Sequence, residues 1–169
     1  LERGLWYPDF RPVLEESPPS HNRLAHALAG PDKPGRLSTG QIETLTRHWH
    51  EQAGDRSLLI SAEALCRHID PRGGRDWYDQ RVGYLERLAE VLSGFEVEVV
   101  LVLRRQDDFA HSVYLENIMK ASKRGRMSFP EFRDYLRKRH LRYEDNIAAF
   151  RERFPRLKIL TYEAIAADK

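Results

Sequence analysis

The clearest pattern along the chain is a short apolar run, Val99 to Leu103, followed by charged residues and then by an amphipathic segment. The run is rich in β-branched residues, which is typical of a strand buried on both faces. Two arginines end it, and two aspartates follow at positions favoured near the start of a helix. We therefore predict a buried strand over 97–103 and a helix over 107–121.

The rest of the chain alternates in the same way between short apolar runs and longer amphipathic stretches. Glycines, prolines and capping residues mark the ends of these segments. Further strands are predicted over 5–7, 57–61 and 157–160, and further helices over 20–28, 38–52, 76–92, 128–139 and 143–154. Strands separated by long helices pair in parallel. The pattern therefore predicts an α/β fold, in which the strands at 57–61, 97–103 and 157–160 form one parallel sheet between two layers of helices.

The end of the strand at 97–103 has the residues of a phosphate site. Arg104 follows the strand directly, and Ser112 lies eight residues later on the predicted helix. Ligands of open α/β sheets bind at the carboxyl ends of the strands. A guanidinium group suits phosphate, and a hydroxyl and the start of a helix add further donors. We expect this strand end to bind a phosphate group.

The same residues resemble a known family. The order strand, arginine, seven residues and serine, in LRRQDDFAHSVY, is similar to the 3′-phosphate-binding segment of sulfotransferases that use PAPS (3′-phosphoadenosine 5′-phosphosulfate), the bacterial-type members in particular. Three further segments resemble the family in order and spacing: LLISAEAL at 58–65, SFPEFRDYL at 128–136 and KILTYEAI at 158–165.

The resemblance implies a fold, an activity and a set of binding residues. The fold would be a three-layer, P-loop NTPase-like sulfotransferase fold. The enzyme would transfer a sulfonate group from PAPS to a hydroxyl or amine of a small-molecule or glycan acceptor, leaving PAP, the 3′,5′-bisphosphate. Arg104 and Ser112 would hold the 3′-phosphate of the nucleotide. Apart from the resemblance, Lys120 is a further candidate for cofactor binding, because it follows Ser112 by eight residues on the same predicted helix.

One signature of the family has no counterpart in this sequence. The family binds the 5′-phosphosulfate with a loop of the form Lys-x-Gly-Thr-Thr, and the nearest segment, Gly30 to Ser38, has neither that spacing nor a preceding strand. We interpret Gly30 to Ser38 as an ordinary loop. Residues 1–169 are therefore expected to be a single domain that is an internal portion of a longer enzyme, truncated at both ends and inactive alone.

Two residues are candidates for the general base that would deprotonate the acceptor. Glu63 follows the strand at 57–61, where the resemblance puts a catalytic residue. His21, after a proline-rich loop, is the second candidate. The alternatives are that Glu63 is an early helix residue favoured by the helix dipole, and that His21 only contacts solvent. The alternative function is a non-catalytic nucleotide- or anion-binding module that acts through a partner.

Composition adds limits. The chain has 169 residues, 41% hydrophobic and 32% charged, as is ordinary for a globular protein. Its formal net charge of +2 gives no case for nucleic acid, and its longest apolar run is too short to span a bilayer. The single cysteine, Cys66, excludes an internal disulfide and suits a reducing, cytoplasmic compartment. No metal-ligand spacing is present, and the oligomeric state stays open.

One charged segment has two interpretations. Lys120, Lys123, Arg124 and Arg126 form a basic cluster. It would either attract an anionic nucleotide or acidic acceptor or be a solvated loop.

Overall fold

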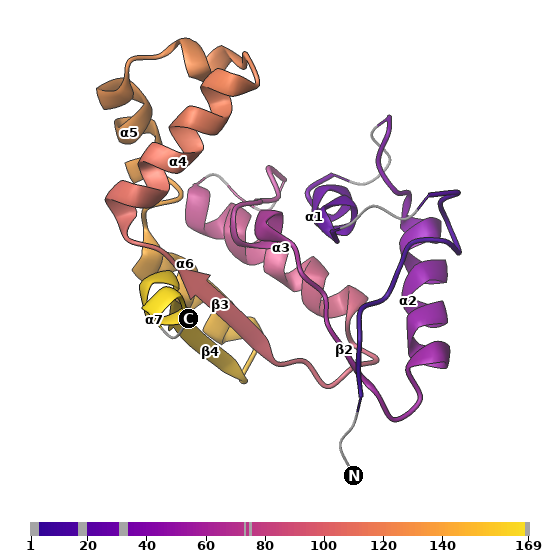
Figure 1. Ribbon diagram of the computed structural model, residues 1–169. Helices are drawn as coiled ribbons and strands as arrows, with labels where there is room; N and C mark the ends of the chain where they lie inside the picture. The colour runs from indigo at the N-terminus through magenta and orange to yellow at the C-terminus, as the bar shows by residue number, and fades with distance from the viewer. Residues whose placement is uncertain (1–3, 17–19, 31–33, 73, 75, 168–169) are drawn as a thin grey trace. The chain divides into compact units, whose positions relative to one another are not determined.

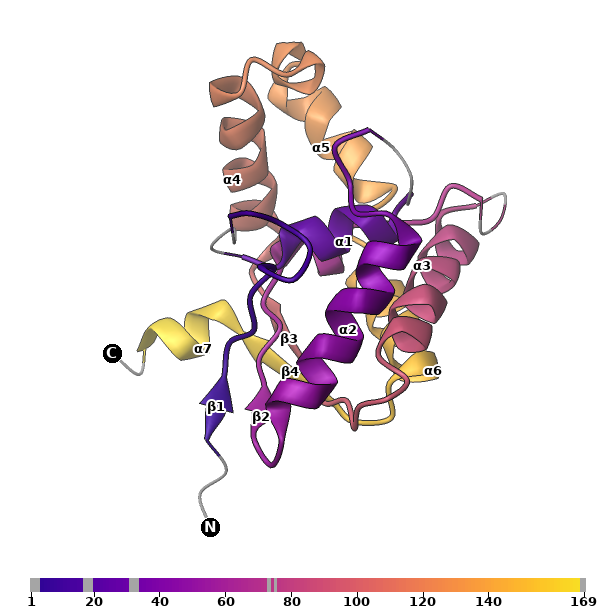
Figure 2. The ribbon, with the colours of Figure 1, turned by 90° about the vertical axis from the view of Figure 1, so that its right-hand side faces the viewer.

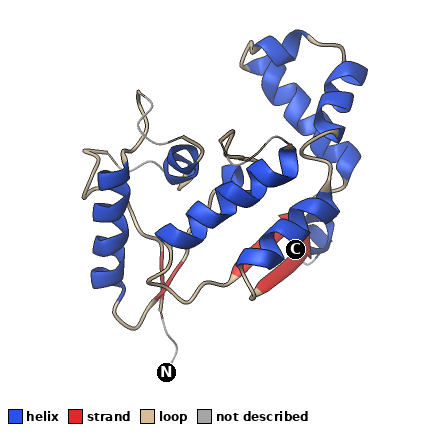
Figure 3. Cartoon of the chain, turned by 180° about the vertical axis from the view of Figure 1, so that it is seen from behind, coloured by secondary structure: helices blue, strands red, loops and turns tan. Residues whose placement is uncertain are grey.

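The computed structural model describes residues 4–16, 20–30, 34–72, 74 and 76–167 (Figure 1). Where the sequence predicts a single domain, the chain divides into two compact units, Leu1–Val97 and Glu98–Lys169. Each is described by itself below, as the N-terminal unit and the C-terminal unit. Parallel strands with helices between them make the chain an α/β protein, as predicted (Figure 3).

The N-terminal unit has a small parallel sheet and three α-helices. Strand β1 (Leu5–Trp6) pairs with β2 (Ser57–Leu58), and the two strands lie side by side in Figure 2. The helices are α1 (Asn22–Leu28), α2 (Thr39–Ala53) and α3 (Trp77–Val91), and a short 3₁₀ helix, η1 (Glu63–Cys66), follows β2. Each α-helix falls within one or two residues of the range that the sequence predicts, and η1 agrees with the alternative that Glu63 is an early helix residue.

Side-chain caps fix the starts of the two long helices of this unit. Ser38 and Gln41 form a capping box, in which each side chain bonds the backbone of the other residue. Asp76 accepts a hydrogen bond from the backbone N–H of Asp79 at 2.9 Å. These caps satisfy N–H groups that the first turn of a helix leaves unpaired.

A buried arginine lies in the core of the N-terminal unit. Arg81 of α3 is completely buried, and it donates hydrogen bonds to the carbonyls of Leu65 and His68 at 2.8 and 2.6 Å. Its guanidinium also lies 5.4 Å from the ring centre of Tyr84, whose hydroxyl donates to the carbonyl of Ala25. Burial lowers the pKa of Arg81 to about 10, so the group stays charged at neutral pH. Arg81 thereby ties the segment after η1 to α3.

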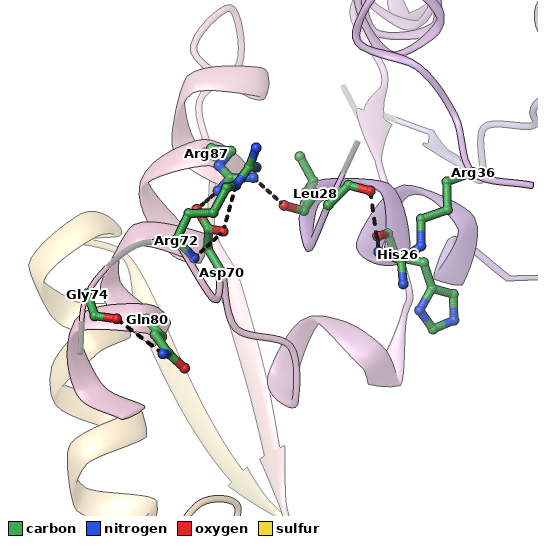
Figure 4. Close-up of polar contacts among 9 residues, drawn as sticks. His26, Leu28, Arg36, Asp70, Arg72, Gly74, Gln80 and Arg87 are labelled. Carbon is green, nitrogen blue, oxygen red and sulfur yellow. Dashed lines mark hydrogen bonds and ion pairs between the residues drawn. The ribbon is translucent and has the colours of Figure 1, made fainter. Parts of the chain in front are cut away.

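A second buried polar group links the same elements (Figure 4). The carboxylate of Asp70, which is 5% exposed, forms ion pairs with Arg72 and Arg87. Arg87 also donates to the carbonyl of Leu28 at the end of α1, at 2.8 Å. Charged side chains therefore connect α1, α3 and the loop between η1 and α3.

The C-terminal unit is built on a second parallel pair of strands. β3 (Val99–Leu103) pairs with β4 (Leu157–Thr161) in a register that joins Val99 to Leu157 and Leu103 to Thr161. Between the strands come α4 (Gln106–Met119), the 3₁₀ helix η2 (Lys123–Arg126), α5 (Phe129–Arg137) and α6 (Tyr143–Arg153), and α7 (Tyr162–Ala167) follows β4. The helices α4, α5 and α6 agree with the sequence prediction, whereas η2 and α7 were not predicted.

The helices α4 and α5 pack against each other and enclose a small core of their own (Figure 1). Ala110 and Val113 of α4 meet Phe132 and Leu136 of α5, and all four are buried. The predicted capping box of Ser128 and Glu131 is present at the start of α5.

Two expectations about the strands need correction. The strands β2, β3 and β4 were predicted to share one sheet, but in the described residues β2 pairs with β1, and β3 pairs with β4. The strand β3 was predicted to be buried on both faces, but only Leu101 is buried, and Val100 and Val102 are 53% and 46% exposed. Side chains alternate between the faces of a strand, so one face of β3 is covered and the other is open. An apolar run in the sequence does not distinguish a strand that is buried on both faces from one that is buried on a single face.

We expect Arg81 to be essential for the stability of the N-terminal unit. In Arg81→Met the half-buried carbonyls of Leu65 and His68 lose the donors that Arg81 supplies from the core. A fully buried acceptor without a partner costs about 1–3 kcal/mol, and these two are half-buried, so the free energy of unfolding should fall by about 2–4 kcal/mol in chemical denaturation. The control is Arg23→Ala, which removes an exposed arginine of α1 and should change stability by less than about 0.5 kcal/mol. Equal effects of the two variants would contradict this assignment.

Candidate functional site

The parallel register brings the carboxyl ends of β3 and β4 together. Leu103 lies opposite Thr161, so Arg104 and Tyr162 are the next residues on the two chains. The guanidinium of Arg104 lies 5.1 Å from the ring centre of Tyr162. Both side chains are exposed. Within the described residues, no carboxylate forms an ion pair with Arg104, so its N–H groups are available to an anion.

The backbone around Arg104 is held by two neighbouring side chains. The hydroxyl of Tyr143, at the start of α6, donates to the carbonyl of Arg104 at 2.8 Å. The carboxylate of Glu163, in the first turn of α7, accepts from the backbone N–H of Arg105 at 3.0 Å. That hydrogen bond, helped by the charges of Arg104 and Arg105, lowers the pKa of Glu163. Tyr143 and Glu163 therefore fix the direction in which the chain leaves β3.

Ser112 lies on the helix that follows Arg104, as predicted. It is the seventh residue of α4 and is exposed. Because a helix rises 1.5 Å per residue, Ser112 lies about 9 Å along the axis from the first residue of α4. The side chains of Arg104 and Ser112 could therefore contact the same phosphate only if it lay between them. Their convergence on a phosphate therefore stays a prediction.

The first turn of α4 differs from the expected phosphate seat. The helix begins at Gln106, one residue before the predicted start, and Asp107 and Asp108 lie in its first turn. Asp107 forms an ion pair with Arg105 at 2.8 Å, and this contact lowers the pKa of the Asp107 carboxyl. These carboxylates already serve the positive end of the helix dipole. The side chains of Arg104 and Ser112, rather than the helix start, are the groups left for a phosphate.

Lys120 lies at the far end of the same helix. It follows the last residue of α4 and forms an ion pair with Glu116. The 14 residues of α4 span about 21 Å. Lys120 therefore lies far from the Arg104 end of the helix, and its role as a cofactor-binding residue stays a prediction.

Glu63 is the first residue of η1 in the N-terminal unit, and its side chain is exposed. Its nearest ionic partner in the described residues is Arg67, at 3.4 Å on the next turn. The residues on both sides of it are bonded to the start of α1. The backbone N–H of Ser61 donates to the ring of His21, and that of Ala64 donates to the side chain of Asn22 at 3.3 Å. An exposed carboxylate on an anchored backbone suits a base that meets an outside substrate.

His21 has a different environment from the one predicted. It is 1% exposed, and the rings of Tyr7, Phe10 and Trp49 surround it. Its Nδ1 accepts from the backbone N–H of Ser61 at 3.1 Å. Its Nε2, 2.9 Å from the carbonyl of Pro8, must then carry the proton and donate. Both ring nitrogens are in use, so the structure favours His21 as a positioning residue for the segment that carries Glu63.

The sequence prediction missed three residues at the strand ends. Tyr143, Tyr162 and Glu163 all contact Arg104 or Arg105. A sequence signal exists for Tyr162 and Glu163, because both lie in the segment KILTYEAI, which resembles the family. Nothing local in the sequence connects Tyr143 with this site, since the contact depends on how α6 returns to the strands.

Other kinds of site would need other features of the described residues. No group of three or more His, Cys, Asp or Glu side chains gathers there to hold a metal ion. No described helix has the length and apolar character that crossing a membrane requires. Burial raises the pKa of the Cys66 thiol, which argues against a reactive thiolate. Of the segment Gly30 to Ser38, residues 31–33 lie outside the described residues.

Comparisons with protein-family models, with curated proteins and with solved structures give no match to this chain.

We expect acidification to destabilise the N-terminal unit. Burial lowers the pKa of His21, and it lowers that of His68 to about 4, with nearby His26 and arginines adding to the effect. Unfolded histidines titrate near 6.5, so between pH 6.5 and about 4 the unfolded chain binds more protons than the folded one. Stability should therefore fall as the pH falls through this window.

Thermal unfolding at pH 7.5, 6.0 and 5.0 measures this effect. The midpoint should fall with pH by roughly 4–8 °C for each kcal/mol lost. In His21→Gln and His68→Gln the midpoint should depend less on pH than in the unchanged chain. A midpoint that stays constant from pH 7.5 to 5.0 would show that these histidines take up protons equally well in both states.

Proposed function

We propose that this chain is part of a PAPS-dependent sulfotransferase of P-loop NTPase-like, three-layer fold. The observation that carries the proposal is the environment of Arg104. It follows a parallel strand, its guanidinium is exposed and forms no ion pair with a carboxylate of the described residues, and Ser112 lies on the next helix. This is the arrangement that the sequence resemblance implies for binding the 3′-phosphate of the donor.

The proposed reaction transfers a sulfonate group without any metal. The oxygen or nitrogen of the acceptor attacks the sulfur of PAPS, the bond from sulfur to the bridging phosphate oxygen breaks, and PAP leaves with that electron pair. The acceptor loses one proton, and Glu63 is the proposed base that takes it. Arg104 and Ser112 hold the donor through its 3′-phosphate, which fixes the position of the reacting end.

His21 supports Glu63 in this proposal. Its ring joins the carbonyl of Pro8 to the backbone N–H of Ser61, two residues before Glu63. A base must lie within hydrogen-bonding reach of the proton that it abstracts, so a fixed backbone near Glu63 favours catalysis. The acceptor is a small alcohol, phenol or amine, or a glycan.

The second candidate function is a non-catalytic module that binds the nucleotide and acts through a partner. The sequence contains no Lys-x-Gly-Thr-Thr segment, the loop that would hold the reacting phosphosulfate, so it does not separate this function from the first. A module of this kind would bind PAP but transfer no sulfonate, and Glu63 could be replaced without effect.

The first test concerns nucleotide binding. A charge-assisted contact contributes roughly 1.5–3 kcal/mol, so Arg104→Ala should weaken PAPS binding by about ten- to a hundredfold. Adenosine 5′-phosphosulfate, which lacks only the 3′-phosphate, should lose far less. Calorimetric titration of both nucleotides measures the difference. The control Arg151→Ala removes an exposed arginine of α6 and should leave both affinities nearly unchanged. Equal losses for the two nucleotides in Arg104→Ala would show that Arg104 does not contact the 3′-phosphate.

The second test concerns the base. In the complete enzyme, Glu63→Gln should lower the turnover of labelled sulfonate transfer by roughly a hundredfold or more, while the affinity for PAPS changes little. The control Glu51→Gln changes an exposed glutamate at the end of α2 and should keep full turnover. Full turnover in Glu63→Gln would remove Glu63 as the base. Nucleotide binding without transfer in the unchanged enzyme would favour the non-catalytic module.

A further inference from the structure

The segment from Lys120 to Arg142 concentrates positive charge. It holds nine Lys and Arg but two Asp and Glu, a net charge of +7, although the whole chain has a formal net charge of +2. The segment runs from the end of α4 through η2 and α5 to the start of α6. Since like charges repel one another, such a cluster favours a bound polyanion.

The described residues neutralise this charge only at the two ends of the segment. Lys120 forms an ion pair with Glu116, and Arg142 forms one with Asp145. Glu131 is engaged in the cap of α5, where it bonds Ser128. Seven exposed cations lie between these ends without an ion pair to any described carboxylate: Lys123, Arg124, Arg126, Arg133, Arg137, Lys138 and Arg139.

Two of these cations are gathered on one aromatic ring. The guanidinium of Arg124 lies 5.0 Å from the ring centre of Tyr135, and that of Arg139 lies 4.9 Å from it. Arg139 also donates to the Tyr135 hydroxyl at 3.2 Å. We call Arg124, Tyr135 and Arg139 the arginine clasp. The ring attracts each cation, but it cannot neutralise the pair, so the clasp brings forked donors together where an anion would find both.

The backbone that carries Arg124 is rigidly held against the end of α4. Ser122 caps η2 by accepting from the N–H of Gly125, and it donates to the side chain of Asn117 at 2.8 Å. A Cβ at Gly125 would lie 2.4 Å from the carbonyl oxygen of Asn117, so only glycine permits this close approach.

The backbone that carries Arg139 is also held. It leaves α5 in a turn whose N–H groups, those of Arg139 and Leu141, both donate to the carbonyl of Leu136. The clasp is therefore arranged before any ligand arrives, which reduces the entropy lost on binding.

We propose that the arginine clasp and the cations beside it bind a linear acidic polysaccharide. Guanidinium forks match the paired oxygens of carboxylate and sulfate groups. A chain that repeats such groups can meet several of the seven cations at once, whereas one small anion cannot. The site uses other residues than the proposed nucleotide site. Arg124 lies in η2, beyond the end of α4 that is about 21 Å from Arg104. Arg139 lies in the turn after α5, which returns toward the start of α4, where the carbonyl of Leu141 accepts from Gln106.

The surroundings of the clasp favour a polysaccharide over nucleic acid or a lipid surface. Single-stranded nucleic acids bind through exposed rings on which bases stack, but both arginines lie against Tyr135. The other nearby rings, Tyr114 and Phe132, pack against each other in the core of the α4–α5 pair. A helix that binds a membrane needs an exposed apolar face. On α5, the helix that carries Tyr135, both Phe132 and Leu136 are buried. At the end of α4, however, Leu115, Ile118 and Met119 are exposed, so the vesicles below test this alternative directly.

The test is the binding of defined ligands to the chain at 0.15 M salt, by isothermal titration calorimetry. The probes are a heparin octasaccharide for sulfate groups, a hyaluronan oligosaccharide for carboxylates, a single-stranded oligonucleotide and vesicles of anionic lipid. We expect at least one of the glycans to bind more tightly than the oligonucleotide and the vesicles. R124A/R139A should weaken glycan binding by about ten- to a hundredfold, with circular dichroism confirming that the variant is folded.

The matched control is R23A/R151A, which removes the same number of charges from exposed helix positions outside this segment. It should weaken binding by less than about fivefold, since exposed charges act weakly in salt. R124K/R139K keeps the charge but loses the fork, and it should bind nearly as poorly as R124A/R139A. Equal losses in the clasp and control variants would show diffuse charge rather than a site. Binding of neither glycan, or tighter binding of the oligonucleotide or the vesicles, would overturn the proposal.

Discussion

The parallel pairing of β3 with β4 is the constraint on which the candidate site depends. It joins two strand ends that are far apart in sequence, so that Arg105 and Glu163, 58 residues apart, share a hydrogen bond. A slip of one residue would turn every side chain of one strand to the opposite face, and Arg104 would lose its position beside Tyr162. Two parallel strands must be joined by a long crossover. Here the chain from α4 to α6 forms that crossover between β3 and β4.

Cations lie at two places along that crossover. At its start, Arg104 lies at the strand end and contacts the ring of Tyr162. At its middle, the segment from Lys120 to Arg142 has a net charge of +7. The length of α4, about 21 Å, separates Arg104 from the η2 end of this segment, whereas the other end of the segment returns to the start of α4, where Leu141 bonds Gln106. The chain outside the segment has an excess of acidic residues, since the total is +2. The positive charge is thus concentrated on one part of the C-terminal unit instead of being spread over the surface.

The helices could be predicted well from the sequence because local residues set their ends. Ser38, Asp76 and Ser128 cap the helices that follow them, and each cap involves a residue only three positions away. Strand pairing and burial could not be predicted as well, because they depend on distant residues. The partner of β2 proved to be β1, and the exposure of Val100 depends on which elements cover the sheet. Arg104 and Ser112 were found from their spacing, but the contacts of Tyr143 and the ring bonds of His21 cross 39 and 40 residues of sequence.

The N-terminal unit shows why a buried polar residue can be mistaken for a catalytic one. His21, Arg81 and Asp70 are each nearly inaccessible to solvent, and each bonds backbone groups or charges on another element. A buried polar group is costly unless it is fully bonded, so such residues select one arrangement of the chain. A histidine after a proline-rich loop appears the same in the sequence whether it titrates or holds the fold. The distinction comes from its two ring nitrogens. In His21 one accepts from Ser61 and the other donates to Pro8, so both ring nitrogens are bonded within the fold.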